Sequence, residues 1–201
     1  KQGEVLGLEA MGPQHFRVRA SFGTLECPAV VIALGPWSSA AGRWLGVSVP
    51  VEPLKGQILR LQVDGPPLSG FISWQDHYAA TKADGLVWAG TTLERAGFDT
   101  RPTAAARERI LTGLLRLFPS LGDARLVQHT ACLRPLSADG LPILGPVPGL
   151  EGAYIATGAG RKGILLGPAM GLATAELIAG GSTSLPIAPF SPGRFARPPL
   201  K

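Results

Sequence analysis

The sequence predicts a mixed α/β fold in which a layered unit of strands and helices is interrupted by an antiparallel insert. The nearly continuous apolar run at residues 25–34 is typical of a strand buried on both faces of a sheet. Short strand-like segments separated by tight turns follow between residues 57 and 92, as in an antiparallel meander. An apolar strand and a helix then return at residues 153–179, which favours a layered unit at both ends of the insert.

The first expected elements form a hairpin and a short helix. Apolar and polar residues alternate at 15–20, which predicts a half-buried strand that leads into the run at 25–34. Ser38 and Ser39 are candidate N-caps of a short helix that Gly46 would end.

The insert is expected to contain mainly short strands. They are predicted at residues 57–63, 70–73 and 77–81, and the turn Ala83–Gly85 leads into another strand.

The clearest predicted helix covers Thr103–Phe118. Thr103 is a suitable N-cap, apolar residues recur at spacings of three and four, and Pro119 would end the helix. Further strands are expected at 125–136 and 153–157, followed by a helix at 163–179.

The composition of the 201 residues excludes several classes of protein. Hydrophobic residues make up 45% and charged residues 16%, which argues against intrinsic disorder. Gly 27 and Pro 19 show no fixed period, so the chain is not collagen-like. The net charge of +5 is scattered, without the basic runs of a nucleic-acid-binding protein. The longest apolar stretch, 163–175, is shorter than the ~20 residues of a membrane-spanning helix, so no membrane span is expected.

Cysteines and histidines give no sign of a disulfide framework or a metal site. Cys27 and Cys132 are the two cysteines, and they fit either a reducing compartment or plain burial. We expect a cytoplasmic protein. His15, His77 and His129 lack ligand spacing, so no metal is expected.

Four segments together resemble a known family. They are ALGPWS (33–38), VEPLKGQILRL (51–61), LRPLSADGLPILGPVP (133–148) and YIATGAGRKGILLGPAMG (154–171). Their order and spacing are similar to those of the D-amino-acid oxidase superfamily of FAD enzymes, and most similar to the glycine oxidase type.

The resemblance implies the later part of a FAD-binding Rossmann-like domain, interrupted by an antiparallel-sheet substrate lobe. Residues 1–50 and 131–181 would belong to the FAD domain, and residues 51–130 to the substrate-binding lobe. Residues 182–201 are rich in serine and proline and are expected to form an extended tail. The N-terminal GxGxxG part of such enzymes is absent from this sequence. A missing N-terminal FAD-binding half, or a partner chain that supplies it, is therefore expected.

The segment GAGRKG, residues 158–163, fits the letters of that glycine motif. No further strand–helix unit follows it, and Glu176 lies inside the expected helix, where it could not bind a ribose. We therefore interpret the segment as the family's turn beside the isoalloxazine ring. A nicotinamide enzyme that uses GAGRKG is a weaker alternative.

The turn gives a physical reason for flavin binding. The first turn of a helix has unpaired N–H groups and a partial positive charge, which would stabilise negative charge at the N1–C2=O edge of a reduced flavin. In the alternative interpretation the glycines only let the helix pack on the sheet. The resemblance implies these cofactor-binding residues: Val5, Arg134, Ala159, Gly160, Arg161, Lys162, Gly163, Ile164 and Leu165.

Three residues match the family's substrate-binding positions: Arg134, Arg161 and Tyr78. An arginine fork suits a carboxylate, and Arg134 lies in an apolar strand, an unusual place for a solvated charge. Arg134 could instead form a structural ion pair with Asp139, Arg161 could simply be exposed, and Tyr78 could be a half-buried sheet aromatic. Ala159 stands where many relatives have a histidine, which leaves the exact substrate open.

These features predict a FAD-dependent enzyme that oxidatively deaminates a small amino acid or amine. No catalytic acid or base is expected, because a neutral amine can transfer its α-hydrogen as a hydride once it is oriented over the flavin. The alternative is a non-catalytic fragment or subunit that needs an upstream FAD-binding partner chain. Exposed apolar surface is expected where the missing half docks, and self-association into a homo-oligomer is a further expectation.

Overall fold

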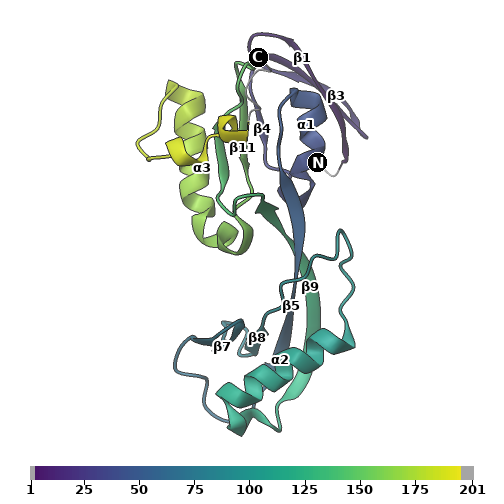
Figure 1. The fold of residues 1–201 in the computed structure, drawn as a ribbon, viewed down its shortest axis with the longest axis vertical. Coiled ribbons are helices and arrows are strands. Elements are labelled where there is room, and N and C mark those ends of the chain that lie inside the picture. Colours follow the sequence, from purple (N-terminus) through teal and green to yellow (C-terminus); the bar gives the residue numbers. More distant parts are fainter. Residues whose placement is uncertain (1–2, 196–201) are drawn as a thin grey trace. The chain divides into compact units, whose positions relative to one another are not determined.

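The computed structural model describes residues 3–195 and divides the chain into two compact units. One unit comprises residues 1–53 and 134–201, and the other comprises residues 54–133 (Figure 1). The mixed α/β class with an interrupting insert is therefore confirmed. The assignment of these segments to a FAD domain and a substrate lobe stays a prediction.

The first unit opens with an antiparallel meander. It consists of β1 (Val5–Gly12), β2 (His15–Ala20) and β3 (Gly23–Cys27), in that order. The expected strand at residues 15–20 is confirmed as β2. Phe16 of β2 is buried in the core of this unit.

A second sheet of the same unit combines distant parts of the chain. Its central strand is β11 (Ala153–Thr157), which pairs antiparallel with β10 (Ile143–Pro146) and parallel with β4 (Val30–Ile32). The order β10-β11-β4 leaves β4 at an edge of this sheet. Strand β10 was not expected from the sequence.

The prediction that residues 25–34 form one strand buried on both faces is wrong. The run is divided between β3 and β4, and β3 is mostly exposed. Pro28 lies at the break, where its missing N–H cannot continue a ladder of hydrogen bonds. The two halves then pair in different sheets, which an apolar run alone does not reveal.

A 3₁₀ turn, Gly35–Ala41, and a short helix, α1 (Gly42–Leu45), follow β4. Gly46 ends the helix in the left-handed conformation, as expected. The prediction that serines cap a helix here is wrong, because no side chain caps either element. The Ser38 hydroxyl instead donates a hydrogen bond to Gly35 O at 2.7 Å.

Helix α3 (Gly163–Gly180) packs on β10 and β11, and it confirms the helix expected at residues 163–179. After it, 3₁₀ turns form at Ala188–Phe190 and Pro192–Phe195. The prediction of an extended tail over 182–201 is therefore wrong for these turns, in which proline fits the first positions. Residues 196–201 lie outside the described part of the chain.

The second unit is built on a five-stranded sheet. Its order is β6-β7-β8-β5-β9, with β6 (Ile72–Trp74), β7 (His77–Thr81), β8 (Val87–Gly90), β5 (Val51–Gln62) and β9 (Arg125–Ser137). The expected antiparallel meander is confirmed by the β6–β7 and β7–β8 pairings. Strand β5 begins earlier than the sequence indicated.

Helix α2 (Ala104–Leu117) covers β7 and β8 of this sheet (Figure 1). Its N-cap is Thr103, whose hydroxyl accepts a hydrogen bond from Ala106 N at 3.3 Å, as expected. Ile110 and Leu114 lie in the apolar core of this unit, which fits their spacing of four.

Candidate functional site

The candidate site is built around the turn between β11 and α3. Strand β11 ends at Thr157, Gly158 takes a positive φ of 76°, and a 3₁₀ turn at Gly160–Lys162 leads into α3. The Thr157 hydroxyl donates to Gly35 O at 3.3 Å and lies 2.7 Å from the Ser38 hydroxyl. These contacts connect the turn to the 3₁₀ segment after β4.

The end of β9 lies directly against this turn. Leu136 forms an isolated antiparallel bridge with Ala159. A Cβ added to Gly158 would come within 3.1 Å of Ser137 Cβ and 3.2 Å of Ile143 Cγ1. Both the positive φ and the close approach therefore require glycine at position 158.

The two candidate arginines lie close to this bridge in the sequence. Arg134 is two residues before Leu136, and Arg161 is two residues after Ala159. Because the bridge is antiparallel, the chain before Leu136 and the chain after Ala159 start from the same end of the bridge. Arg161 then lies in the 3₁₀ turn Gly160–Lys162. Arg134 is half-buried and Arg161 is exposed.

The alternative partner suggested for Arg134, Asp139, is engaged elsewhere. Both carboxylate oxygens of Asp139 accept hydrogen bonds from Arg194, at 2.7 and 3.0 Å. This arginine holds the pKa of Asp139 well below its usual range. A structural ion pair with Arg194 therefore explains Asp139 without involving Arg134.

Helix α3 begins without a capping side chain. Lys162 occupies the N-cap, no acidic residue lies in the first turn, and Arg161 precedes it. The side chains of the first turn are largely uncovered, since Ile164 is 97% and Leu165 is 79% exposed. The helix dipole and two basic residues thus give this end a positive potential.

The structure places the other expected cofactor residues as follows. Ala159 is buried, Gly160 and Gly163 are half-buried, and Lys162 is exposed. Val5 starts β1, pairs with Ala20 and is 37% exposed. The turn residues 159–165 are contiguous, whereas Val5 belongs to the other sheet of the unit.

Tyr78 belongs to the second unit, in β7. Its ring stacks on Phe71 at a centroid distance of 5.4 Å, and it lies over Gly90 of the neighbouring strand. Both contacts define the position of the phenol within this unit. Its part in substrate binding stays a prediction.

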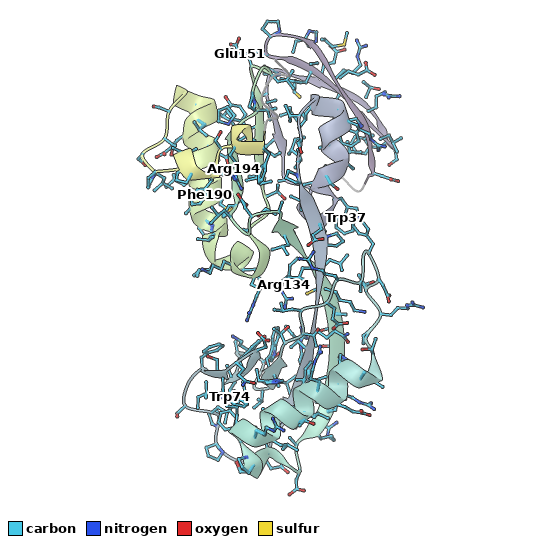
Figure 2. All side chains as sticks on the ribbon, in the orientation of Figure 1. Trp37, Trp74, Arg134, Glu151, Phe190 and Arg194 are labelled. Atoms are coloured by element: carbon cyan, nitrogen blue, oxygen red, sulfur yellow. The ribbon has the colours of Figure 1, made fainter. Side chains whose placement is uncertain are left out.

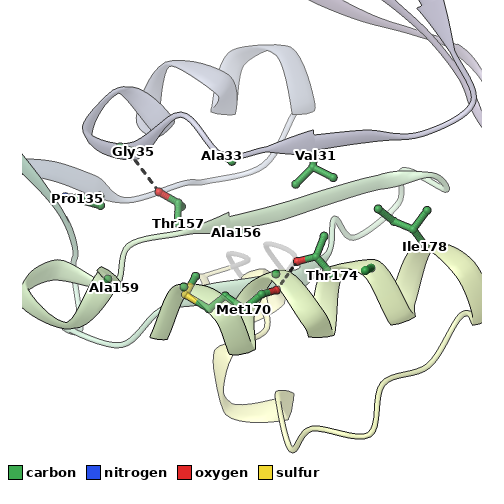
Figure 3. Close-up of a pocket in the computed structure, with 14 residues that line it drawn as sticks. Val31, Ala33, Gly35, Pro135, Ala156, Thr157, Ala159, Met170, Thr174 and Ile178 are labelled. Carbon is green, nitrogen blue, oxygen red and sulfur yellow. Dashed lines mark hydrogen bonds between the residues drawn. The ribbon is translucent and has the colours of Figure 1, made fainter. Parts of the chain in front are cut away.

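An apolar groove of about 500 Å³ runs between α3 and the β11–β4 side of the sheet (Figure 3). Val31 and Ala33 line one side, and Gly163, Gly167 and Gly171 line the helix side. A Cβ at Gly167 or Gly171 would meet nothing within 4 Å, so the groove reaches the helix backbone at these positions.

Helix α3 is apolar but little buried. The segment Gly160–Gly180 is long and apolar enough to cross a membrane by length and composition, and little of it is buried. One such helix is weak evidence for a membrane span, because core helices of soluble proteins can have the same length and composition. The expectation that no segment spans a membrane stays a prediction.

The family can now be assigned from the comparisons with known proteins. A family model described as "DAO: FAD dependent oxidoreductase" matches residues 1–177.

The chain belongs to this family of FAD-dependent oxidoreductases.

The relatives give the same result by sequence and by fold. Glycine oxidase from Pseudomonas putida is 38% identical over 175 residues, which cover 87% of this chain and 48% of that protein. Hydrogen cyanide synthase subunit HcnC from Pseudomonas protegens is 36% identical over 89% of this chain and 43% of its own length. The crystal structure of glycine oxidase from Geobacillus kaustophilus matches with a TM-score of 0.90 and 31% identity, covering 98% of this chain and 52% of that one.

The chain spans about half the length of the curated relatives it matches. The resemblance to the glycine oxidase type is confirmed, and so is the membership of a FAD-dependent enzyme family. The roles of the individual site residues stay predictions.

Two long-range contacts around the candidate site were not predicted from the sequence. The Ser38–Thr157 contact joins residues 119 positions apart, and the Arg194–Asp139 pair joins residues 55 positions apart. The second had a signal: Arg194 is a charged residue among the proline, serine and phenylalanine residues of 189–195. An isolated charge in such a segment indicates an ion-pair partner elsewhere in the chain.

Proposed function

We propose that this chain supplies the ring-binding and substrate-binding half of a FAD-dependent oxidase or dehydrogenase of small amino acids or amines. The observation that carries the proposal is the family match over residues 1–177, combined with the uncapped, basic start of α3 after a glycine turn. We assign residues 1–53 and 134–181 to the FAD domain and residues 54–133 to the substrate lobe.

The turn fits the ring end of FAD. Its backbone N–H groups at Gly163, Ile164 and Leu165 lack a capping side chain, and no carboxylate in the first turn opposes an electron-rich group. When bound, FAD would accept the hydride from the α-carbon of the amine. The start of α3 and Arg161 would then stabilise the negative charge at the N1–C2=O edge.

The substrate carboxylate is assigned to the arginines. The chain segments that carry Arg134 and Arg161 start from one end of the Leu136–Ala159 bridge, so their guanidinium groups can converge on one carboxylate. This clamp would orient the α-hydrogen and make a side-chain acid or base unnecessary. A small substrate is supported by relatives named glycine oxidase and by a structure named iminodiacetate oxidase, 29% identical with a TM-score of 0.87.

A second polypeptide segment is proposed to complete the fold. Strand β4 lies at the edge of its sheet, the adjoining groove is apolar, and Ile164 and Leu165 are uncovered. A strand added beside β4, followed by a helix in the groove, would cover these surfaces. The relatives are about twice as long as this chain, so their additional length is sufficient for such a segment. We place the assembled protein in the cytoplasm.

The test uses the protein expressed from its complete gene and, in parallel, residues 1–201 alone. The visible spectrum and the flavin released on denaturation give the FAD content per chain. Anaerobic addition of glycine, sarcosine, iminodiacetate or D-alanine then shows which amine reduces the flavin.

We expect one FAD per assembled protein and bleaching by at least one of these small amines. The isolated chain should be colourless and should gain flavin when the upstream segment is added. A complete protein that binds no flavin, or binds NADH tightly instead, would overturn the proposal. Flavin that no amine reduces would leave only the non-catalytic alternative.

A further inference from the structure

The side chain of Arg194 connects the C-terminal tail with the loop after β9. It lies in the 3₁₀ turn Pro192–Phe195, next to Phe190 (Figure 2). Its Nε donates to Asp139 Oδ2 at 2.7 Å, and its Nη2 donates to Asp139 Oδ1 at 3.0 Å and to Leu141 O at 3.1 Å. All three guanidinium nitrogens are engaged, because Nη1 donates to Phe190 O and Ser191 O.

This contact differs from an ordinary surface ion pair. The Arg194 side chain is only 19% exposed, and its guanidinium lies 4.2 Å from the centroid of the Phe195 ring. A bidentate, partly buried pair with further bonds to carbonyl groups has a defined geometry, whereas exposed pairs usually contribute little. We call Arg194 and Asp139 the tail clamp.

The tail clamp organises the whole loop 137–141. Asp139 Oδ1 also accepts hydrogen bonds from Leu141 N at 3.1 Å and from the Ser137 hydroxyl at 3.2 Å. The Ser137 hydroxyl lies 2.6 Å from Leu141 O and can donate to it instead. The Asp139 carboxylate therefore accepts hydrogen bonds both from Arg194 and from the two ends of the loop, Ser137 and Leu141.

The loop also lies close to the glycine turn of the candidate site. Ser137 is 2% exposed, and its Cβ would lie 3.1 Å from a Cβ at Gly158. Its neighbour Leu136 bridges to Ala159, two residues before Arg161. Close-packed interiors transmit such displacements, so a shift of Ser137 would reach the turn.

We propose that Arg194 is a positioning residue, which acts through Asp139 and Ser137 to fix the turn Gly158–Lys162, and with it Arg161 and the start of α3. The inference rests on the proposed function for its catalytic consequence. Its structural consequence, a fixed turn, can be measured without FAD. The competing explanation is a clamp that only fastens the tail and stabilises the unit.

The test compares Arg194→Gln, Arg194→Lys and a matched control. The control is Arg101→Gln, because Arg101 also binds a carboxylate with two nitrogens, to Asp99 at 2.9 and 3.3 Å, in the other unit. Arg194→Lys keeps the charge but loses the bidentate geometry. The protein from the complete gene is used throughout.

The first readout is hydrogen exchange of backbone amides in the apoprotein. We expect Arg194→Gln to accelerate exchange at residues 158–163 by about tenfold, with Arg194→Lys in between and Arg101→Gln without effect there. Amides of β1 and β2 serve as an internal reference and should be unchanged. Unchanged exchange at 158–163 in both Arg194 variants would overturn the proposal.

The second readout is the steady-state kinetics of the FAD-loaded protein. We expect Arg194→Gln to raise KM by about tenfold with a smaller change in kcat. The reason is that the variant displaces Arg161, which is proposed to bind the substrate carboxylate, and does not displace the hydride acceptor. A lowered melting temperature with normal KM and normal exchange would identify a purely structural clamp and overturn the proposal. If the unaltered protein shows no oxidation, the proposed function fails, and the exchange readout still decides the role of Arg194.

Discussion

Gly158 offers the sharpest test of the turn, through substitution by alanine. Its φ of 76° places an added Cβ in the left-handed region, which costs about 1–2 kcal/mol for a residue other than glycine. The same Cβ would lie 3.1 Å from Ser137 Cβ and 3.2 Å from Ile143 Cγ1. Crowding of a packed site adds about 1–3 kcal/mol, so Gly158→Ala should lose about 2–5 kcal/mol in total.

Gly149→Ala separates these two contributions. Gly149 lies in the same unit with a φ of 78°, and an added Cβ there would meet nothing within 4 Å. This control should lose only the conformational contribution of about 1–2 kcal/mol. Each kcal/mol corresponds to a melting temperature lower by about 2–4 °C in a chain of this size.

Thermal and denaturant unfolding of both variants, followed by circular dichroism, gives the comparison. We expect Gly158→Ala to be the less stable variant by about 1–3 kcal/mol. Equal losses in the two variants would refute the reasoning, because they would mean that the turn moves away from Ser137 and Ile143 at no cost.

Three further substitutions test other parts of the account. Arg134→Lys should raise KM for the amino-acid substrate by about tenfold and change the flavin content less, since lysine cannot bind a carboxylate with two parallel hydrogen bonds; unaltered kinetics would contradict the proposed role of Arg134 in binding the carboxylate. Thr103→Ala should destabilise α2 by about 1 kcal/mol, with Thr103→Ser restoring most of it, and an unchanged unfolding midpoint would count against the cap. Arg194→Gln should flatten the acid side of the stability profile. Because Arg194 lowers the pKa of Asp139, the ion pair should stabilise the folded protein fully above about pH 4 and lose this stabilisation as the pH falls further. A variant whose stability falls in acid as much as that of the parent would disprove the role of the pair.

The elements with a strong local pattern were predictable from sequence. Strand β2 alternates strictly, α2 has a capping threonine and a regular apolar stripe, and α3 is a mainly apolar helix between two glycines. Each of these depends on interactions within a few residues. Their bounds agree with the structure to within two residues.

The remaining features depend on partners far along the chain. The run at 25–34 gave no sign of which sheet each half would join, and the Ser38 hydroxyl turned to Gly35 and Thr157 rather than to a helix end. The tail was predicted to be extended because proline is frequent there. Arg194 of this segment instead pairs with Asp139. The isolated charge indicated that Arg194 has a partner, but nothing local identified a residue 55 positions away as that partner.

The candidate site was predictable where it follows a sequence motif, and not where it depends on contacts between distant residues. The resemblance identified the turn 158–163 and both arginines, and the chain segments that carry Arg134 and Arg161 start from one end of the Leu136–Ala159 bridge. The supporting contacts behind the turn became visible only in the structure.

Protection of the first amides of α3 by FAD tests the central claim most directly. Hydrogen exchange at Ile164 and Leu165 should be measured in the complete protein with and without FAD, because their N–H groups lie in the first turn of a helix that no side chain caps. The account predicts that stoichiometric FAD slows exchange at these two positions, while the exposed residue Leu172 of the same helix keeps its rate. Full flavin binding with unchanged exchange at Ile164 and Leu165 would contradict it.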